Sequence, residues 1–469
     1  MKVNSRNTDT SSFWLFLLEL PFWLCFSYWS LLADTLTPKF DFLSIPVNVK
    51  DLVLIAVACF YLLLLILTNF GGTTNDKPWN WHCHLPILTV FLLFYAAVSI
   101  QRSGIDASNA RAMTYTLVLT ASAFLLGYIL LARRSITSVR PFLWRLTVYL
   151  AVLGLLYSVA SLFSLGMGDV RADLNAGASE FGIVRVQGPL FGSSTGYFIL
   201  VPALAFAIQE SMQSHTRRLF KLTVVMALTL TIIGLGSRAA LLIMGLFFLC
   251  LIFFMKNKKQ AIIAAIMMII LISTATIIIY SRASSDRIKS FEDTTRSDTY
   301  LTSFQIISHR NTELNITGSG YGSYWSWYLT DMDDMRVGAG NGAPVILVYP
   351  FGYLLYHPHS TFLLCVVELG IPGLIYFSIL WIVLVRLLRN RQGIESAIFN
   401  SGIFASGFSM FFDFFIFKGG QLSLIWWVYL FGALALNVSL KNGQKENNKI
   451  AERKFIQAKE QKILISKLK

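Results

Sequence analysis

Two histidines flank a proline in the stretch YHPHS, residues 356–360, directly before a long apolar run. An imidazole is the side chain that most readily takes a proton from a hydroxyl near neutral pH. Because Pro358 fixes its own φ and biases the preceding residue towards extended geometry, the two imidazoles are not equivalent. His359 precedes Ser360, a suitable N-cap, and the positive end of a helix dipole favours a neutral imidazole. We therefore expect His359 to be the catalytic base or hydrogen-bond acceptor, with His357 supporting it.

Other interpretations of these histidines stay open. In β conformation both imidazoles would share a face and could hold a metal, but no third ligand stands at a recognisable spacing. A histidine at a membrane surface can also be only an amphipathic anchor. Two further stretches resemble metal sites, HCH at 82–84 and DMDD at 331–334, but the first is isolated and the second is better explained as a solvated acidic turn. The sequence predicts no metal and no cofactor.

A lone carboxylate, Glu368, lies nine residues after His359 within the apolar run. At the standard rise of a helix this places it about 13 Å further along, inside the hydrocarbon layer. An ionisable group at such depth usually has a function or belongs to a buried hydrogen-bond network. We expect Glu368 to be a buried hydrogen-bonding brace. Gly370, Pro372 and Gly373 follow it, so the helix should bend there.

Three arginines are predicted to lie on the same side of a membrane as these histidines. They are Arg185, Arg238 and Arg296. The planar guanidinium binds phosphate oxygens with two parallel hydrogen bonds and keeps its charge. Arginines near helix ends can instead reach lipid headgroups or pair with nearby acids. Arg238 fits those alternatives least, because a positive charge in a very short external connection opposes the positive-inside trend. We expect the three to bind a diphosphate.

The elements that must position these residues are apolar helices. The chain has 469 residues, of which 55% are hydrophobic and only 14% charged, which excludes an ordinary soluble enzyme. A membrane-spanning helix needs about 20 apolar residues, and the sequence holds about twelve such segments. They begin near Ser12, Asp51, His84, Met113, Pro141, Thr195, Arg218, Arg238, Gln260, Thr361, Ser396 and Gln421. The expected fold is an all-α polytopic membrane protein.

The distribution of Lys and Arg predicts the orientation of the chain. Most of the 39 basic residues fall on connections that share one side with both termini, which are therefore predicted to be cytoplasmic. The net charge of +14 suits anionic lipid headgroups, and nucleic-acid binding is not needed to explain it. The long external loop between the ninth and tenth helices, of about 80 residues, is of a length that is usually functional. It contains GSGYGSYWSWY, whose aromatics suit an interfacial belt or a platform for sugar rings.

We divide the chain accordingly into four parts. Residues 1–280 form an N-terminal transmembrane bundle, 281–359 the periplasmic loop with short helices, 360–440 the C-terminal transmembrane helices, and 441–469 a basic cytoplasmic tail.

Six short motifs resemble, in order and predicted side, those of the bacterial O-antigen ligase and Wzy-type O-antigen polymerase superfamily. They are Arg185-Val-Gln-Gly188, Ser237-Arg238, Arg296, Gly318-Ser-Gly320, His357-Pro-His359-Ser360 and Glu368-Leu-Gly370-Ile-Pro-Gly373. The resemblance covers about residues 181–377. Ser360 departs from it, because the family usually has asparagine there.

The resemblance implies a GT-C-like fold in the bacterial inner membrane and an active site facing the periplasm. It implies an inverting, metal-independent glycosyltransferase that moves a glycan from undecaprenyl diphosphate to an acceptor hydroxyl. A polymerase that extends a surface polysaccharide, with a chain-length regulator as a further partner, is our first hypothesis. A ligase that transfers the finished glycan to lipid A-core is the alternative, since the motifs do not separate the two. A transporter of the lipid-linked sugar is a third hypothesis, but its charges should line a path across the bilayer.

Overall fold

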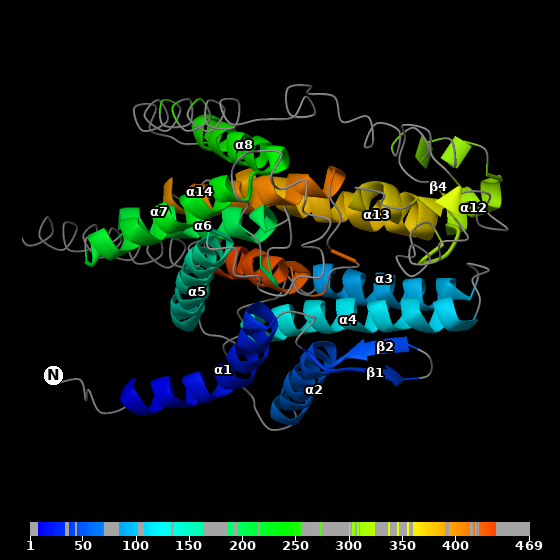
Figure 1. Cartoon of the computed structure of the whole chain (residues 1–469), viewed down its shortest axis with the longest axis horizontal. Coiled ribbons are helices and arrows are strands. Elements are labelled where there is room, and N and C mark those ends of the chain that lie inside the picture. Colours follow the sequence, from blue (N-terminus) through cyan, green and yellow to red (C-terminus); the bar gives the residue numbers. More distant parts are fainter. Residues whose placement is uncertain are drawn as a thin grey trace, which may run out of the picture.

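The computed structural model is mostly helical in the residues that it describes (Figure 1). These residues are 8–32, 37–42, 45–69, 84–101, 107–132, 136–162, 186, 188–190, 196–213, 216–254, 266, 270, 273, 300, 303–304, 307–308, 310–323, 336–337, 345–346, 354–355, 360–389, 394–412, 416–417, 420 and 422–437.

The long helices begin close to where the apolar segments of the sequence begin. They are α1 (Thr8–Leu31), α2 (Val49–Asn69), α3 (His84–Ile100), α4 (Ala107–Ala132), α5 (Ile136–Leu162), α6 (Tyr197–Gln213), α7 (Arg218–Gly234), α8 (Arg238–Phe254), α13 (Thr361–Arg389), α14 (Ile394–Phe408) and the helix Leu422–Asn437. The segment predicted to begin near Gln260 lies outside the described residues, apart from isolated positions.

Within the described part of the chain, four helices are long and apolar enough to cross a membrane. They are Val49–Leu67, Met113–Leu131, Ser138–Ser161 and Thr361–Arg389. Large apolar side chains are exposed on other helices, with Phe94 of α3 68% exposed and Phe253 of α8 70% exposed. Hydrocarbon is a better environment than water for such surfaces. The chain is therefore a helical membrane-embedded protein, and the count of about twelve spans stays a prediction.

Small residues let the helices of the bundle approach closely. In Figure 1, α6, α7 and α14 lie together, and α6 packs on both of the others. A Cβ atom on Gly402 of α14 would overlap Ala205 of α6, and one on Gly127 of α4 would lie 2.9 Å from the Cβ atom of Trp427. Packing of this kind holds membrane helices together, because the hydrophobic effect gives little attraction between them in lipid.

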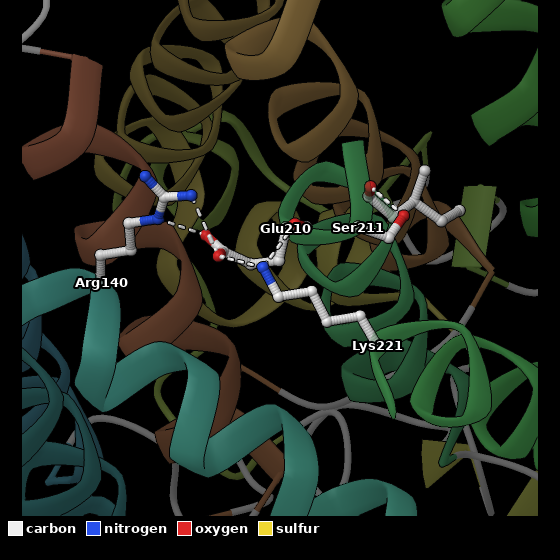
Figure 2. A network of polar contacts seen from close by, with 5 residues as sticks. Arg140, Glu210, Ser211 and Lys221 are labelled. Carbon is white, nitrogen blue, oxygen red and sulfur yellow. Dashed lines mark hydrogen bonds and ion pairs between the residues drawn. The ribbon is translucent and has the colours of Figure 1, made fainter. Parts of the chain in front are cut away.

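Ion pairs join neighbouring helices of the bundle. Figure 2 shows the carboxylate of Glu210, near the end of α6, between Arg140 of α5 and Lys221 of α7. Arg140 Nη2 donates to Glu210 Oε2 at 3.0 Å, and Lys221 Nζ donates to the carbonyl oxygen of Glu210 at 2.9 Å. Arg145 of α5 pairs with the buried Glu19 of α1. Three basic residues from stretches predicted to be cytoplasmic therefore connect helices within the protein.

Two small antiparallel sheets were not part of the all-α expectation. Strand β1 (Lys39–Phe42) pairs with β2 (Ile45–Asn48) between α1 and α2, with Phe40 opposite Val47. Within the predicted periplasmic loop, β3 (Arg336–Val337), β4 (Val345–Ile346) and β5 (Leu354–Leu355) form a sheet in that order. Strands of two to four residues are too short to show an alternating pattern.

Candidate functional site

The structure describes two of the six residues for which the sequence predicts a role in binding or catalysis, Arg238 and Glu368. The others, Arg185, Arg296, His357 and His359, lie outside the described residues, and their roles stay predictions. The described residues next to them in the sequence nevertheless show which parts of the protein several of these motifs contact.

Helix α13 begins where the sequence predicts, immediately after the histidine stretch. The Oγ atom of Ser360 accepts a hydrogen bond from the backbone nitrogen of Leu363 at 3.2 Å, and its carbonyl oxygen accepts one from Leu364 at 3.1 Å. Ser360 is thus a buried N-cap, which satisfies a donor of the first turn that has no partner within the helix. The expected cap at this position is confirmed.

Helix α13 is interrupted at Gly370, which has φ 61° and ψ −141°. Beyond it, Pro372 has no backbone N–H to offer to the carbonyl oxygen of Glu368 four residues earlier. The bend expected from the sequence is confirmed. It ends a first half-helix, residues 361–369, whose last carbonyl groups have hydrogen-bond partners elsewhere in the chain.

Those partners come from the glycine loop, which we define as residues 318–323. Ser319 donates its backbone N–H to the carbonyl oxygen of Val367 at 3.0 Å, and its Oγ atom donates to the same oxygen at 3.0 Å. Gly320 donates its backbone N–H to the carbonyl oxygen of Glu368 at 2.9 Å. Gly318 has φ +76°, and a Cβ atom there would overlap the same Glu368 oxygen. Two motifs that are far apart in sequence thus meet through their backbones.

The glycine loop is also fixed to the rest of the bundle. Tyr321, which is 1% exposed, donates its hydroxyl to the carbonyl oxygen of Phe417 at 2.6 Å, and its N–H bonds to Ser99 of α3 at 3.0 Å. Tyr95 of α3 donates to the carbonyl oxygen of Thr317 at 2.6 Å. Because its ring is buried, Tyr321 is neither an interfacial belt residue nor a sugar platform.

Arg310 is the residue at this site that sequence reasoning missed. Its Nη1 atom donates to the carbonyl oxygen of Val367 at 2.7 Å and its Nη2 atom to that of Val366 at 3.0 Å, while Nε donates to Asn315 Oδ1 at 2.6 Å. Burial lowers the pKa of the Arg310 guanidinium, but an arginine keeps its charge through such shifts. In the sequence Arg310 is one more polar residue of a loop, and only its position before the short helix α12 (Thr312–Thr317) sets it apart.

Glu368 lies at the interruption of α13 with its side chain fully buried. Its carbonyl oxygen accepts the hydrogen bond from the backbone N–H of Gly320 in the glycine loop. The burial agrees with the depth expected from the sequence, and the role of the carboxyl group as a brace stays a prediction.

Arg238 is the first residue of α8, as the sequence predicts, and is half-buried. A tight turn with Gly236 at φ 60° separates it from α7. The Oγ atom of Ser237 accepts a hydrogen bond from the N–H of Ala240 at 3.4 Å and so caps α8. The Ser237-Arg238 motif therefore forms a helix start in a very short connection.

In the motif at 185–188, Val186 lies against the end of α7, directly before this turn. Val186 donates its N–H to the carbonyl oxygen of Gly234 at 2.8 Å, and a Cβ atom on Gly234 would lie 2.6 Å from a methyl group of Val186. Gly188 lies against the ring of Tyr157 of α5, where a side chain would overlap the aromatic carbons. The sequence places Arg185 directly before Val186, so its motif is tied to the connection that carries Arg238.

The site thus consists of two docked pairs of segments. One pair joins the motif at 185–188 to the turn before Arg238, and the other joins the glycine loop to the first half-helix of α13. In the described part of the chain no group of three or more His, Cys, Asp or Glu is placed to hold a metal ion. The first pair presents a half-buried cation at a helix start, and the second fixes a capped half-helix. In comparisons with known proteins, no family model and no curated protein matches this chain.

Proposed function

We propose that this protein is a glycosyltransferase of the bacterial inner membrane that acts at the periplasmic face. It transfers a glycan from undecaprenyl diphosphate to an acceptor hydroxyl of another lipid-linked glycan, and so polymerises a surface polysaccharide. The observation that carries the proposal is the docking of the Gly318-Ser-Gly320 motif onto the Glu368-Leu-Gly370 motif. In the family resemblance these motifs are separate stretches of sequence. If they belong to one active site, they must lie together in the fold, and this contact agrees with that requirement.

The chemistry of this transfer suits the residues. Diphosphate is a good leaving group, so the site needs cations to stabilise the charge that develops on it more than it needs a general acid. In the proposal Arg185, Arg238 and Arg296 bind the diphosphate. His359 takes the proton of the acceptor hydroxyl as that oxygen attacks the anomeric carbon and the bond to the diphosphate breaks, which inverts the configuration.

The arrangement around Arg238 supports a role at the donor. The backbone of Arg238 is placed by a tight turn and a helix start, and the segment that bonds the end of α7 contains Val186, the residue after Arg185. Two arginines that we expect to bind the diphosphate thus belong to segments in backbone contact. Arg296 has no described neighbours that bear on this point.

Deletion of the gene followed by profiling of the surface glycan tests the proposal. Loss of a polymerase leaves a core capped by a single repeat unit. A bare core with long lipid-linked chains accumulating would assign the protein as the ligase instead. An unchanged glycan profile would contradict both assignments.

A purified assay tests the mechanism. The protein in detergent or nanodiscs is given lipid-diphosphate-linked donor, and product chains are followed by gel or mass spectrometry. We expect His359→Ala to abolish transfer while the donor still binds. Full activity of His359→Ala would show that His359 is not the base.

A further inference from the structure

Arg310 adds a side-chain link between two segments that the glycine loop also joins through hydrogen bonds from Ser319 and Gly320. Its guanidinium bonds the carbonyl oxygens of Val366 and Val367, two successive residues at the end of the first half-helix. Nε is held at the same time by Asn315 of α12, so the guanidinium plane is fixed from the loop side. The contact therefore connects α12 and α13 through one side chain.

The residue type matches the acceptors. A half-helix that ends inside a protein leaves its last carbonyl groups without helical donors and carries the negative end of its dipole there. A cation in the last turn offsets that partial charge. Two carbonyl oxygens side by side suit a donor with two parallel N–H groups, which arginine has in a rigid plane, whereas the lysine ammonium is a compact point charge.

The position of Arg310 argues against direct contact with substrate. It bonds the end of the half-helix, whereas the residues expected to handle the acceptor precede its start at Ser360. Val366 is six residues after Ser360, which corresponds to about 9 Å along a helix. Arg310 is also committed through all three of its guanidinium nitrogen atoms to protein oxygens.

We propose that Arg310 is a positioning residue for glycan transfer. By holding the end of the first half-helix against α12 and the glycine loop, it sets where the start of that helix lies, and with it the segment that leads in from His359. The inference rests on the function proposed above. It adds that the periplasmic loop contributes to the reaction by placing a helix, in addition to any contact with glycan.

The first test compares turnover and donor affinity in the purified transfer assay. We expect Arg310→Ala to lower kcat by about 10- to 100-fold, since a shift of about 1 Å in a catalytic group has effects of this size. The KM for the lipid-linked donor should stay at the wild-type value. The kcat of Arg310→Lys should be close to that of Arg310→Ala, because lysine keeps the charge but lacks the paired N–H donors. Arg386→Ala is the matched control, an exposed arginine on the same helix beyond the interruption.

Added guanidinium ion gives a second readout that a general loss of folding would not produce. It should restore part of the turnover of Arg310→Ala, and methylammonium, which lacks the paired donors, should not. An unchanged kcat in Arg310→Ala, or a raised KM with unchanged kcat, would overturn the positioning role. The second result would place Arg310 in contact with the donor instead.

A third measurement separates this inference from the proposed function. Hydrogen exchange of the peptide that contains Ser319 and Gly320 reports whether their amides still bond the half-helix. We expect faster exchange in Arg310→Ala than in wild type or Arg386→Ala. Equal exchange in all three proteins would refute the positional effect whether or not transfer is observed. A wild-type protein without transfer activity would instead refute the function proposed above.

Discussion

Gly318 and Gly370 are in backbone contact across the junction between the glycine loop and α13. The backbone nitrogen of Gly370 lies 2.6 Å from where a Cβ atom of Gly318 would stand, and a Cβ atom of Gly370 would overlap the backbone nitrogen of Gly318. Both residues have positive φ, 76° and 61°. Each position therefore requires glycine for two separate reasons.

Replacing either glycine by alanine should destabilise the protein. Their positive φ is combined with ψ values of 163° and −141°, a region that is nearly restricted to glycine and costs a residue with a Cβ atom about 1–3 kcal/mol, and the overlap with backbone adds to this cost. We expect Gly318→Ala and Gly370→Ala to lower the thermal unfolding midpoint in detergent. Gly420→Ala is the control, because the nearest atoms to its Cβ position lie 3.8 Å away. A midpoint for Gly318→Ala equal to that of Gly420→Ala would contradict the docking.

The cap of α13 can be tested at Ser360. Removal of its hydroxyl in Ser360→Ala should cost about 1 kcal/mol of stability, and transfer should weaken because the start of the half-helix frays. Ser360→Asn should keep the cap, since asparagine caps helices as well as serine does. This is also the residue that the resembling family usually has at this position. If Ser360→Asn lost as much stability as Ser360→Ala, the cap would not be the reason for serine here.

The ion pairs around Glu210 should be unequal in their effects. Glu210→Gln leaves Lys221, whose side chain is 11% exposed, without its carboxylate and should destabilise the protein by about 3 kcal/mol. Arg140→Ala should cost no more than about 1 kcal/mol, because the Arg140 side chain is 42% exposed and water screens the pair. The thermal unfolding midpoints of Glu210→Gln and Arg140→Ala are compared with that of the wild type. Equal decreases in the two variants would show that the pairing of Lys221 with the carboxylate does not contribute to stability.

Arg238 should affect donor affinity more than turnover. Arg238→Lys keeps the charge but loses the paired donors that suit phosphate oxygens, so the KM for the lipid-linked donor should rise. Inorganic pyrophosphate should compete with the donor in the wild type, and its inhibition should weaken in the variant. Unaltered inhibition by pyrophosphate in Arg238→Lys would remove Arg238 from the proposed diphosphate site.

The helices and their starts were the most predictable part of this protein. Long apolar runs are strong signals, and Arg238 and Thr361 begin helices as expected. The interruption of α13 was equally predictable from the sequence, because glycine and proline determine the local backbone conformation themselves. Local rules were sufficient for these features.

The partners of the interrupted helix were not predictable in the same way. Nothing in the sequence around Arg310 indicates which of the chain's many carbonyl groups it will bond, because the choice depends on how α12 and α13 lie in space. The burial of Tyr321 has the same origin, since its hydroxyl partner at Phe417 is 96 residues away. The short strands β1 to β5 gave no pattern to detect.

The contact between the glycine loop and the first half-helix also bears on how the chain holds together when it is cut. Residues 310–323 and 360–369 share bonds from Arg310, Ser319 and Gly320 to three successive carbonyl groups. Their association therefore does not depend on the covalent path between them. A protease cleavage site inserted between residues 324 and 359 should yield two fragments that migrate together in detergent, and each fragment could carry its own label.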